Sequence, residues 1–162
     1  ITLVKCDEQT TLLHQQPFNV DEAVRDTVES FAELAQAKDC SLDISSLPEL
    51  IFCGDEAAVR QLVSILLDNA VKYAVPDTVI HVSLEPLRRG VQLAVENDYV
   101  QPIDVPLDRL FDRFYRPDAS RTAATGGFGI GLSIAKSIAE AHHGTICAST
   151  KENRITFTAE LK

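Results

Sequence analysis

Residues 126–138 combine a cluster of glycines with the start of a helical pattern, which suits phosphate binding. The cluster reads Gly126-Gly127-Phe128-Gly129-Ile130-Gly131-Leu132-Ser133. Gly127, Gly129 and Gly131 allow the backbone to approach a ligand closely, because glycine adopts backbone angles that a side chain forbids. A helix N-terminus behind them would offer unpaired N–H groups and a positive dipole end to a phosphate. The alternative is a tight turn or a helix-packing site, so the motif is weak alone.

A second group of polar residues ends the segment 55–73, whose apolar residues have helical spacing. In a helix of 3.6 residues per turn, Ile65, Asn69, Lys72 and Tyr73 share one face. An amide oxygen can hold a divalent cation, an ammonium group can meet a phosphate, and a phenol ring can flank a base. The alternative interpretation is an ordinary helix that ends in solvated polar residues.

A third group mixes aromatic residues with arginines shortly before the glycines, in Phe111-Asp112-Arg113-Phe114-Tyr115-Arg116. We expect Phe111 and Phe114 to anchor a loop on the core. The arginines, Arg116 among them, are candidates for anion contacts, because guanidinium matches the geometry of phosphate.

The composition narrows the class of protein. The net charge of −9 argues against a general nucleic-acid binder, which must neutralise phosphates. The four cysteines are far apart and have no metal-ligand spacing, which favours reduced thiols in a cytosolic setting. No apolar run approaches the ~20 residues that span a bilayer. The chain has no methionine, even at position 1, so we expect a piece of a longer protein.

The elements that must position these groups follow from periodicity and turn signals. We expect helices at 22–38, 55–73 and after the glycine cluster, and strands at 12–18, 40–45, 49–53, 79–87, 91–96, 145–149 and 155–161. Helices mixed with antiparallel hairpins indicate an α+β sandwich with helices on one face. Residues 97–128 look mostly irregular, and a segment of that length inside a compact domain is usually a lid or mobile loop.

Taken in order, these motifs resemble the catalytic and ATP-binding domain of sensor histidine kinases, within the group that includes gyrase, Hsp90 and MutL ATPases. Residues 66–73, 111–116 and 126–133 correspond to the N, F and last G boxes of that family. The resemblance implies a two-layer α/β sandwich of the Bergerat type, with a mixed, mostly antiparallel sheet and a flexible ATP lid over about 101–128. It also implies a domain at 11–162, preceded at 1–10 by the tail of a helical dimerisation element.

The resemblance assigns roles to single residues. Asn69 would hold Mg²⁺ and, with Lys72, serve catalysis, while Tyr73 would line the adenine or ribose side. The remaining candidates for contacts to ATP are Arg116, Gly127, Gly129, Gly131, Leu132 and Ser133. The implied reaction transfers the γ-phosphate of ATP to a histidine on separate upstream helices, with a response regulator as partner. We expect an isolated monomer and a cytoplasmic domain of a membrane-bound sensor.

Two positions depart from the family pattern. The family has an Asp-x-Gly-x-Gly box whose Asp binds the adenine amino group, but this chain reads Asn97-Asp98-Tyr99-Val100-Gln101. Asn97 can still accept through its amide oxygen, and Asp98 could substitute by a shift of one residue. Ile65 stands where related ATP hydrolases have a water-activating glutamate, so hydrolase activity is disfavoured. The alternative function is a degenerate, non-catalytic docking module with weak or no nucleotide binding.

Other readings fit less well. A dinucleotide-binding oxidoreductase should carry its glycines after the first strand of a βαβ unit, and here they come late. The chain's histidines also lack the family's phosphoacceptor pattern of a histidine beside an acidic residue on a helix. These are His14, His81, His142 and His143. His142 and His143 flank a helix end, where a cation suits the dipole. Because the four histidines lack the family's pattern, we expect the phosphoacceptor histidine upstream.

Overall fold

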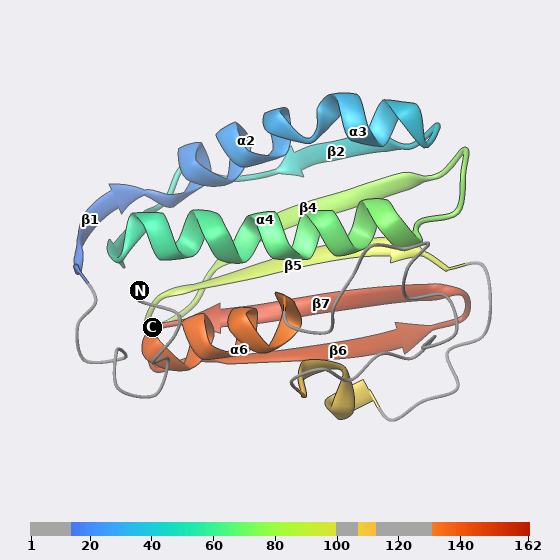
Figure 1. Cartoon of the computed structure of the whole chain (residues 1–162). Helices are drawn as coiled ribbons and strands as arrows, with labels where there is room; N and C mark the ends of the chain where they lie inside the picture. The colour runs from blue at the N-terminus through green and yellow to red at the C-terminus, as the bar shows by residue number, and fades with distance from the viewer. Residues whose placement is uncertain (1–13, 100–106, 113–130) are drawn as a thin grey trace.

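Helices cover one face of a five-stranded sheet in the computed structural model, which describes residues 14–99, 107–112 and 131–162 (Figure 1). The sheet has the strand order β2-β4-β5-β7-β6, and a two-stranded sheet pairs β1 with β3. The strands are β1 (Gln16–Asn19), β2 (Ser41–Ser46), β3 (Ile51–Gly54), β4 (Val79–Pro86), β5 (Val91–Asp98), β6 (Thr145–Lys151) and β7 (Arg154–Leu161). The helices are α2 (Val20–Ser30), α3 (Ala32–Ala37), α4 (Glu56–Tyr73), the 3-10 helix η2 (Leu107–Phe111) and α6 (Gly131–Ala141).

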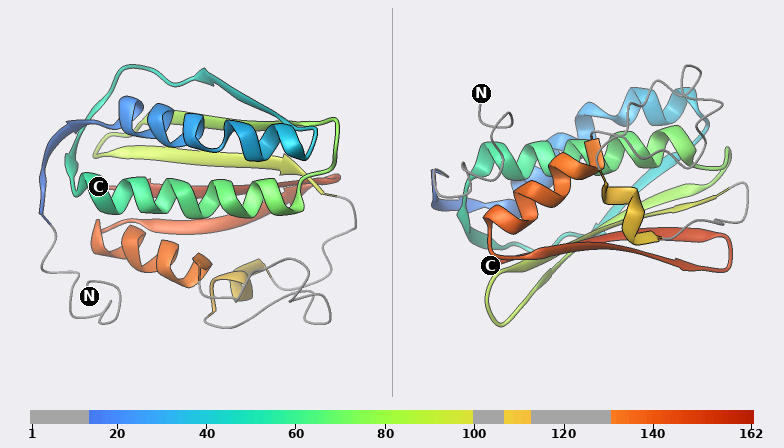
Figure 2. Two further views of the ribbon diagram at one scale, coloured as in Figure 1. Left: turned by 45° about the horizontal axis from the view of Figure 1, so that its top comes forward. Right: turned by 60° about the horizontal axis from the view of Figure 1, so that its bottom comes forward.

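The main sheet is mixed but mostly antiparallel. The pairs β4–β5, β5–β7 and β7–β6 are antiparallel, and β2 joins β4 in parallel. The two views of Figure 2 show the helices as one layer on a twisted sheet. This two-layer arrangement confirms the α+β class and the one-sided placement of the helices.

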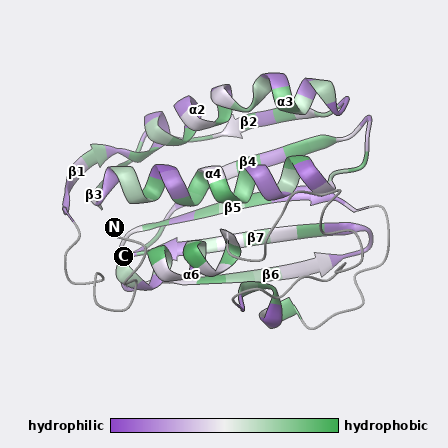
Figure 3. Ribbon diagram, viewed as in Figure 1, coloured by the Kyte–Doolittle hydropathy of each residue, from purple (hydrophilic) through white to green (hydrophobic). Residues whose placement is uncertain are grey.

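The core lies between the sheet and α4. Residues of β5 alternate between buried and half-buried, as expected for a strand with one face against helices. The apolar side of α4 is buried against that face, and hydrophobic residues recur along α4 and the strands beneath it (Figure 3). The largest fully buried side chains of α4 are Leu62, Leu66 and Leu67. This packing fixes α4 over the central strands.

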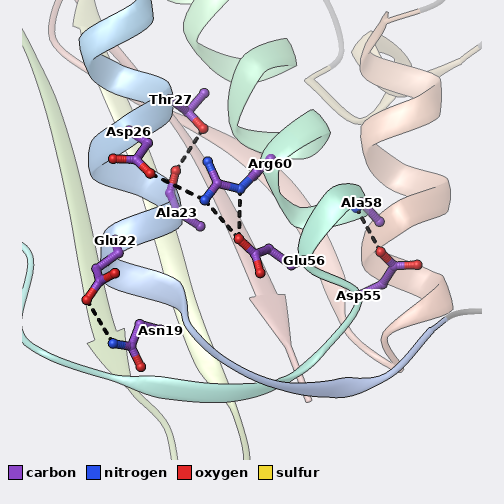
Figure 4. Close-up of polar contacts among 9 residues, drawn as sticks. All are labelled: Asn19, Glu22, Ala23, Asp26, Thr27, Asp55, Glu56, Ala58 and Arg60. Atoms are coloured by element: carbon purple, nitrogen blue, oxygen red, sulfur yellow. Dashed lines mark hydrogen bonds and ion pairs between the residues drawn. The ribbon is translucent and has the colours of Figure 1, made fainter.

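Polar contacts fix the start of α4 and tie it to α2 (Figure 4). The Asp55 carboxylate caps the helix by accepting from the backbone N–H of Ala58 at 3.1 Å. The Arg60 guanidinium donates to Glu56 one turn earlier on α4 and reaches Asp26 of α2 at 3.3 Å. These ion pairs are partly exposed, so their contribution to stability is small.

Several predicted boundaries were wrong. The helix predicted over 22–38 is two helices that meet at Phe31, whose φ of −100° and ψ of 0° depart from helical values. The first strand is shorter and later than 12–18. β5 continues through Asn97 and Asp98, which were expected in an irregular segment, because these residues pair with Ile155 and Arg154 of β7.

α6 lies beside α4 and runs in the opposite direction. A Cβ built on Gly131, the first residue of α6, would lie 3.5 Å from the Cγ2 atom of Ile65, near the middle of α4. At the other end, the His142 ring meets the backbone of Asp55, where α4 starts. The C-terminal half of α4 therefore extends beyond α6 (Figure 1). Within the described parts of the chain, none of the helices has both the length and the apolar character needed to cross a bilayer.

Candidate functional site

The part of α4 that extends beyond α6 carries the polar group predicted from the sequence. Asn69 and Lys72 are half-buried, as is Tyr73, the last residue of the helix. Helical spacing places Asn69 one turn before Tyr73. The structure therefore brings these side chains to the end of α4 that lies over the C-terminal end of β5 (Figure 1, Figure 2).

Lys72 and Lys38 each make a polar contact at this end of α4. The Nζ atom of Lys72 lies 3.0 Å from a carboxylate oxygen of Asp68, one turn back. The Nζ atom of Lys38, which follows α3, donates to the backbone carbonyl of Lys72 at 2.9 Å. A cation at a helix C-terminus satisfies an otherwise unpaired carbonyl and suits the dipole. Lys38 thus holds the last turn of α4, a role that the local sequence did not indicate.

Asn97 lies at the end of β5 on the side of the sheet that faces the helices. Only 1% of its surface is exposed. Its Nδ2 atom donates to the carbonyl of Asp98 at 2.8 Å, whereas its Oδ1 atom is buried without any hydrogen-bond partner in the described structure. A buried polar atom without a partner costs about 1–3 kcal/mol, so such atoms are rare and point to a ligand or a bound water. Because Nδ2 already donates to Asp98, the Oδ1 atom is the group of Asn97 that can accept a hydrogen bond from a ligand.

Asp98, the second candidate for the same contact, lies on the opposite side of the strand. Successive residues of a strand point to opposite faces of the sheet. An oxygen of the Asp98 carboxylate accepts from the Nε atom of Arg154 at 2.9 Å, across the β5–β7 pair. Its backbone carbonyl also accepts from Val75, just after α4. Asp98 therefore does not share the helix-facing side with Asn97.

Tyr99 follows β5 and lies beside the last turn of α4. It was not among the predicted site residues. Its ring stacks on that of Tyr73, with the centroids 6.2 Å apart and the planes 9° from parallel. A β-bridge joins Tyr99 to Ala74, and the Tyr99 N–H donates to the carbonyl of Asn153. The signal that could have found Tyr99 is the two-residue period of a strand, which puts it on the same face as Asn97.

The first residues of α6 supply the third side of the site. Gly131, Leu132 and Ser133 form the first turn of a helix of 11 residues, and Gly131 is exposed. The 3.5 Å contact that a Gly131 side chain would make with Ile65 is ordinary van der Waals contact. Packing against α4 therefore does not require glycine at position 131. The prediction that Gly131 lets the backbone approach a ligand closely thus remains a prediction.

Other predicted residues lie outside the described structure. These are Arg116, Gly127 and Gly129, the predicted anchor Phe114, the predicted lid at 101–128 apart from residues 107–112, and the predicted tail at 1–10. Phe111, expected to anchor a loop, is buried with its ring edge-on to Phe157 of β7, 6.0 Å between centroids.

Asn69 is the candidate ligand for Mg²⁺ in this corner of the domain. The described residues contain no group of three or more His, Cys, Asp or Glu side chains placed to hold a metal ion. Mg²⁺ in nucleotide sites typically keeps several waters and takes one or two protein oxygens together with the phosphates. A single amide oxygen from Asn69 fits that pattern, with the remaining ligands coming from nucleotide and water.

His142, at the far end of the α4–α6 pair, is fully buried rather than solvated. Its Nδ1 atom lies 2.9 Å from the carbonyl of Ile138, and its Nε2 atom accepts from the N–H of Asp55 at 3.1 Å. The two bonds require a neutral ring with the proton on Nδ1. Burial lowers the pKa of His142, and its bond to Ile138 offsets only part of that effect. The expectation of a cation at this helix end is wrong for His142.

Comparison with known proteins identifies the fold's family. Residues 54–162 match the family described as "Histidine kinase-, DNA gyrase B-, and HSP90-like ATPase". The chain belongs to this family. The matched region contains α4, β5 and α6, the three elements that form the site. The predicted resemblance to histidine kinase ATP-binding domains is thereby confirmed.

Similar proteins within the family are sensor kinases. The sensor histidine kinase CusS of Escherichia coli O157:H7 is 33% identical over 159 residues, which are 98% of this chain and 33% of CusS. The probable sensor protein PcoS of Escherichia coli is 39% identical over 113 residues, 70% of this chain and 24% of PcoS. The chain thus spans a third or less of the length of these relatives.

Solved structures share the fold. The histidine kinase AdeS of Acinetobacter baumannii superposes with a TM-score of 0.80 at 22% identity, covering 99% of this chain and 73% of that one. A catalytic domain of the histidine kinase ThkA gives a TM-score of 0.75 over 91% of this chain and 96% of its own, also at 22% identity. The described architecture is therefore that of a histidine kinase catalytic domain.

Proposed function

We propose that this domain binds ATP through the corner formed by α4, β5 and α6, and that it transfers the γ-phosphate to a histidine on upstream helices of the same protein. The observation that carries the proposal is the buried, unpaired Oδ1 atom of Asn97. The 6-amino group of adenine is a donor that would satisfy this acceptor. Asn97 rather than Asp98 makes this contact in the proposal, because Asp98 is paired with Arg154.

The other residues follow from their places around Asn97. Tyr73 lines the base, and Asn69 supplies the protein oxygen for Mg²⁺, which offsets the charge of the triphosphate. Lys72 approaches a phosphate by exchanging its partner Asp68, an exposed carboxylate that releases it at low cost. The first turn of α6 offers the N–H groups of Gly131, Leu132 and Ser133. Arg116, Gly127 and Gly129 are retained as phosphate contacts on sequence grounds alone.

Transfer to histidine rather than to water is supported by Ile65. This residue lies one turn before Asn69, and its side chain can neither accept a proton nor bind a metal. Phosphoryl transfer depends mainly on positioning and charge stabilisation. A histidine acceptor brings its own nucleophile, so the domain needs no residue to activate water.

The partners of the domain follow from its relatives. The histidine kinase ThkA has been solved in complex with the response regulator protein TrrA, and that chain superposes on 92% of this one with a TM-score of 0.72. We propose a response regulator and the upstream helices as partners, on the cytoplasmic side of a membrane-bound sensor. We also propose that the isolated domain is a monomer and, with a net charge of −9, does not bind nucleic acid.

A second candidate function is a docking module without catalysis. The near-complete burial of Asn97 favours it, because a nucleotide cannot reach that acceptor in the described conformation. Isothermal titration calorimetry with ATP, with and without Mg²⁺, separates the two functions. Saturable binding that Mg²⁺ strengthens, followed by phosphate transfer from radiolabelled ATP to a protein that includes the upstream helices, supports the kinase. No heat of binding up to millimolar ATP supports the docking module.

A further inference from the structure

We propose that the ring of Tyr99 competes with the base for the face of Tyr73, which makes Tyr99 a built-in brake on nucleotide binding in this chain. The inference rests on the proposed function, because it concerns the same corner of the domain. It goes further by assigning a role to a residue that stands where the family resemblance expects a glycine.

The first observation is the stack itself. The two rings are nearly parallel, and their centroid distance of 6.2 Å lies within the ~4.5–7 Å range of direct aromatic pairs. No third ring fits between partners in direct contact. A base that uses the face of Tyr73 on which Tyr99 stacks must therefore displace Tyr99. A glycine at position 99 would leave that face open.

The second observation is independent of the rings. The Oδ1 acceptor of Asn97 is buried and unpartnered, and Asn97 lies two residues before Tyr99, which follows the end of β5. The Nδ2 bond to Asp98 keeps Oδ1 turned away from that carbonyl. The site thus holds an acceptor ready for a ligand, but in a conformation that keeps both ligand and solvent from it.

The third observation concerns what holds Tyr99 in place. Its backbone bridges to Ala74 on one side and donates to Asn153, in the turn between β6 and β7, on the other. The neighbouring Asp98 is tied to Arg154 of β7 and to Val75. With the backbone anchored at these points, the opening that admits the base is a rotation of side chains rather than a departure of the strand end.

The test compares Tyr99→Gly with Tyr99→Phe, which keeps the ring. Calorimetry with Mg-ATP should give the glycine variant a dissociation constant about two- to tenfold lower than the parent, the effect expected from removing one aromatic pair. The phenylalanine variant, which keeps the ring, should bind more weakly than the glycine variant. Equal or weaker binding by the glycine variant overturns the brake, because the ring would then be neutral or would support the base. If circular dichroism shows the glycine variant unfolded, Tyr99→Ala replaces it under the same criteria.

A spectroscopic measurement follows the rings directly. The chain has no tryptophan and only three tyrosines, so a Tyr115→Phe background leaves Tyr73 and Tyr99 alone. In that background, labelled with 3-fluorotyrosine, Mg-ATP should shift both ¹⁹F resonances by removing their mutual ring current. Binding that leaves both resonances unmoved overturns the proposal.

The calorimetry separates failure of the proposed ATP binding from failure of the brake. If the parent and all folded variants bind no ATP, the proposed function fails and the brake fails with it. If the parent binds and the glycine variant binds no better, only the brake fails. If the parent does not bind but the glycine variant does, the brake is supported in its strongest form.

Discussion

The imidazole of His142 accepts a hydrogen bond from the backbone N–H of Asp55 at 3.1 Å, which joins the end of α6 to the start of α4. The same ring lies against Gly54, where an added Cβ would come within 2.9 Å of it. Neither side of this contact tolerates much change. It lies at the opposite end of α4 from Asn69 and Tyr73, so it can be tested without touching the proposed nucleotide site.

The buried His142 should make stability depend on pH. Its folded-state pKa is lowered, mainly by burial, from the usual value of about 6.5. The unfolded chain therefore binds the proton more readily, and the stabilising contribution of the neutral ring is present above pH ~6.5 and is lost as pH falls towards the folded-state pKa. Protonation would also set a donor against the N–H of Asp55.

Chemical denaturation of the parent and His142→Leu over pH 5–8 measures this effect. The difference in unfolding free energy should be constant above about pH 7.5 and narrow as the pH falls. His143→Asn is the matched control, since His143 is exposed at a positive φ of 58° that asparagine tolerates. A difference that stays constant over the whole range would show that His142 does not titrate in this window.

Asn69→Ala should abolish the enhancement of ATP binding by Mg²⁺. The amide is the one protein oxygen that we assign to the cation, and it is only half-buried, so the thermal midpoint of the free domain should change by no more than a few degrees. Calorimetry with and without Mg²⁺ and a thermal melt provide the two readouts. Gln61→Ala, a half-buried amide two turns earlier on α4, should behave as the parent. An Asn69→Ala protein with undiminished binding of Mg-ATP would remove the metal assignment.

Asn97→Asp should have opposite effects on the free and bound domain. Without nucleotide, a carboxylate oxygen replaces the Nδ2 atom that donates to Asp98, and losing that buried bond should cost about 1–3 kcal/mol of stability. With nucleotide, a charged acceptor should bind the adenine amino group more tightly. Thermal melts and calorimetry measure the two effects, with the exposed Gln36→Glu as a charge-matched control. A variant that is more stable than the parent and binds ATP no better would contradict both halves.

Lys38→Met should loosen the last turn of α4. The lysine donates to the carbonyl of Lys72, and a bond from a charged donor contributes about 1.5–3 kcal/mol when partly buried. Faster amide hydrogen exchange at Lys72 and Tyr73, with a modest drop in thermal midpoint, is the expected outcome. Lys136→Met, at an exposed position of α6, is the control. Unchanged exchange rates would mean that packing alone holds this turn.

The sequence predicted the parts of the site that depend on local pattern. α4 was predictable because Asp55 is a good N-cap and because the apolar residues recur at helical spacing through Leu66 and Leu67. Asn69, Lys72 and Tyr73 interrupt that spacing together, which marked them as candidates. The assignment of roles to them still depends on the family resemblance.

Long-range pairing explains what local pattern missed. Asn97 and Asp98 belong to β5 because β7 pairs with them, and no local signal predicts that partner. The stack of Tyr73 on Tyr99 and the bond between His142 and Asp55 likewise join residues far apart in the sequence. The break at Phe31 has no proline or glycine to announce it, and the structure offers no single cause for it.

α6 runs along α4 from Gly131, which lies opposite Ile65, to His142, which is hydrogen-bonded to the backbone of Asp55. The two helices therefore form one packed unit. Gly131, the first residue of α6, is thereby held beside the middle of α4. The N–H groups that the first turn of α6 would offer to a phosphate are consequently positioned by α4, so the two helices would present their proposed ligand contacts as one preassembled surface.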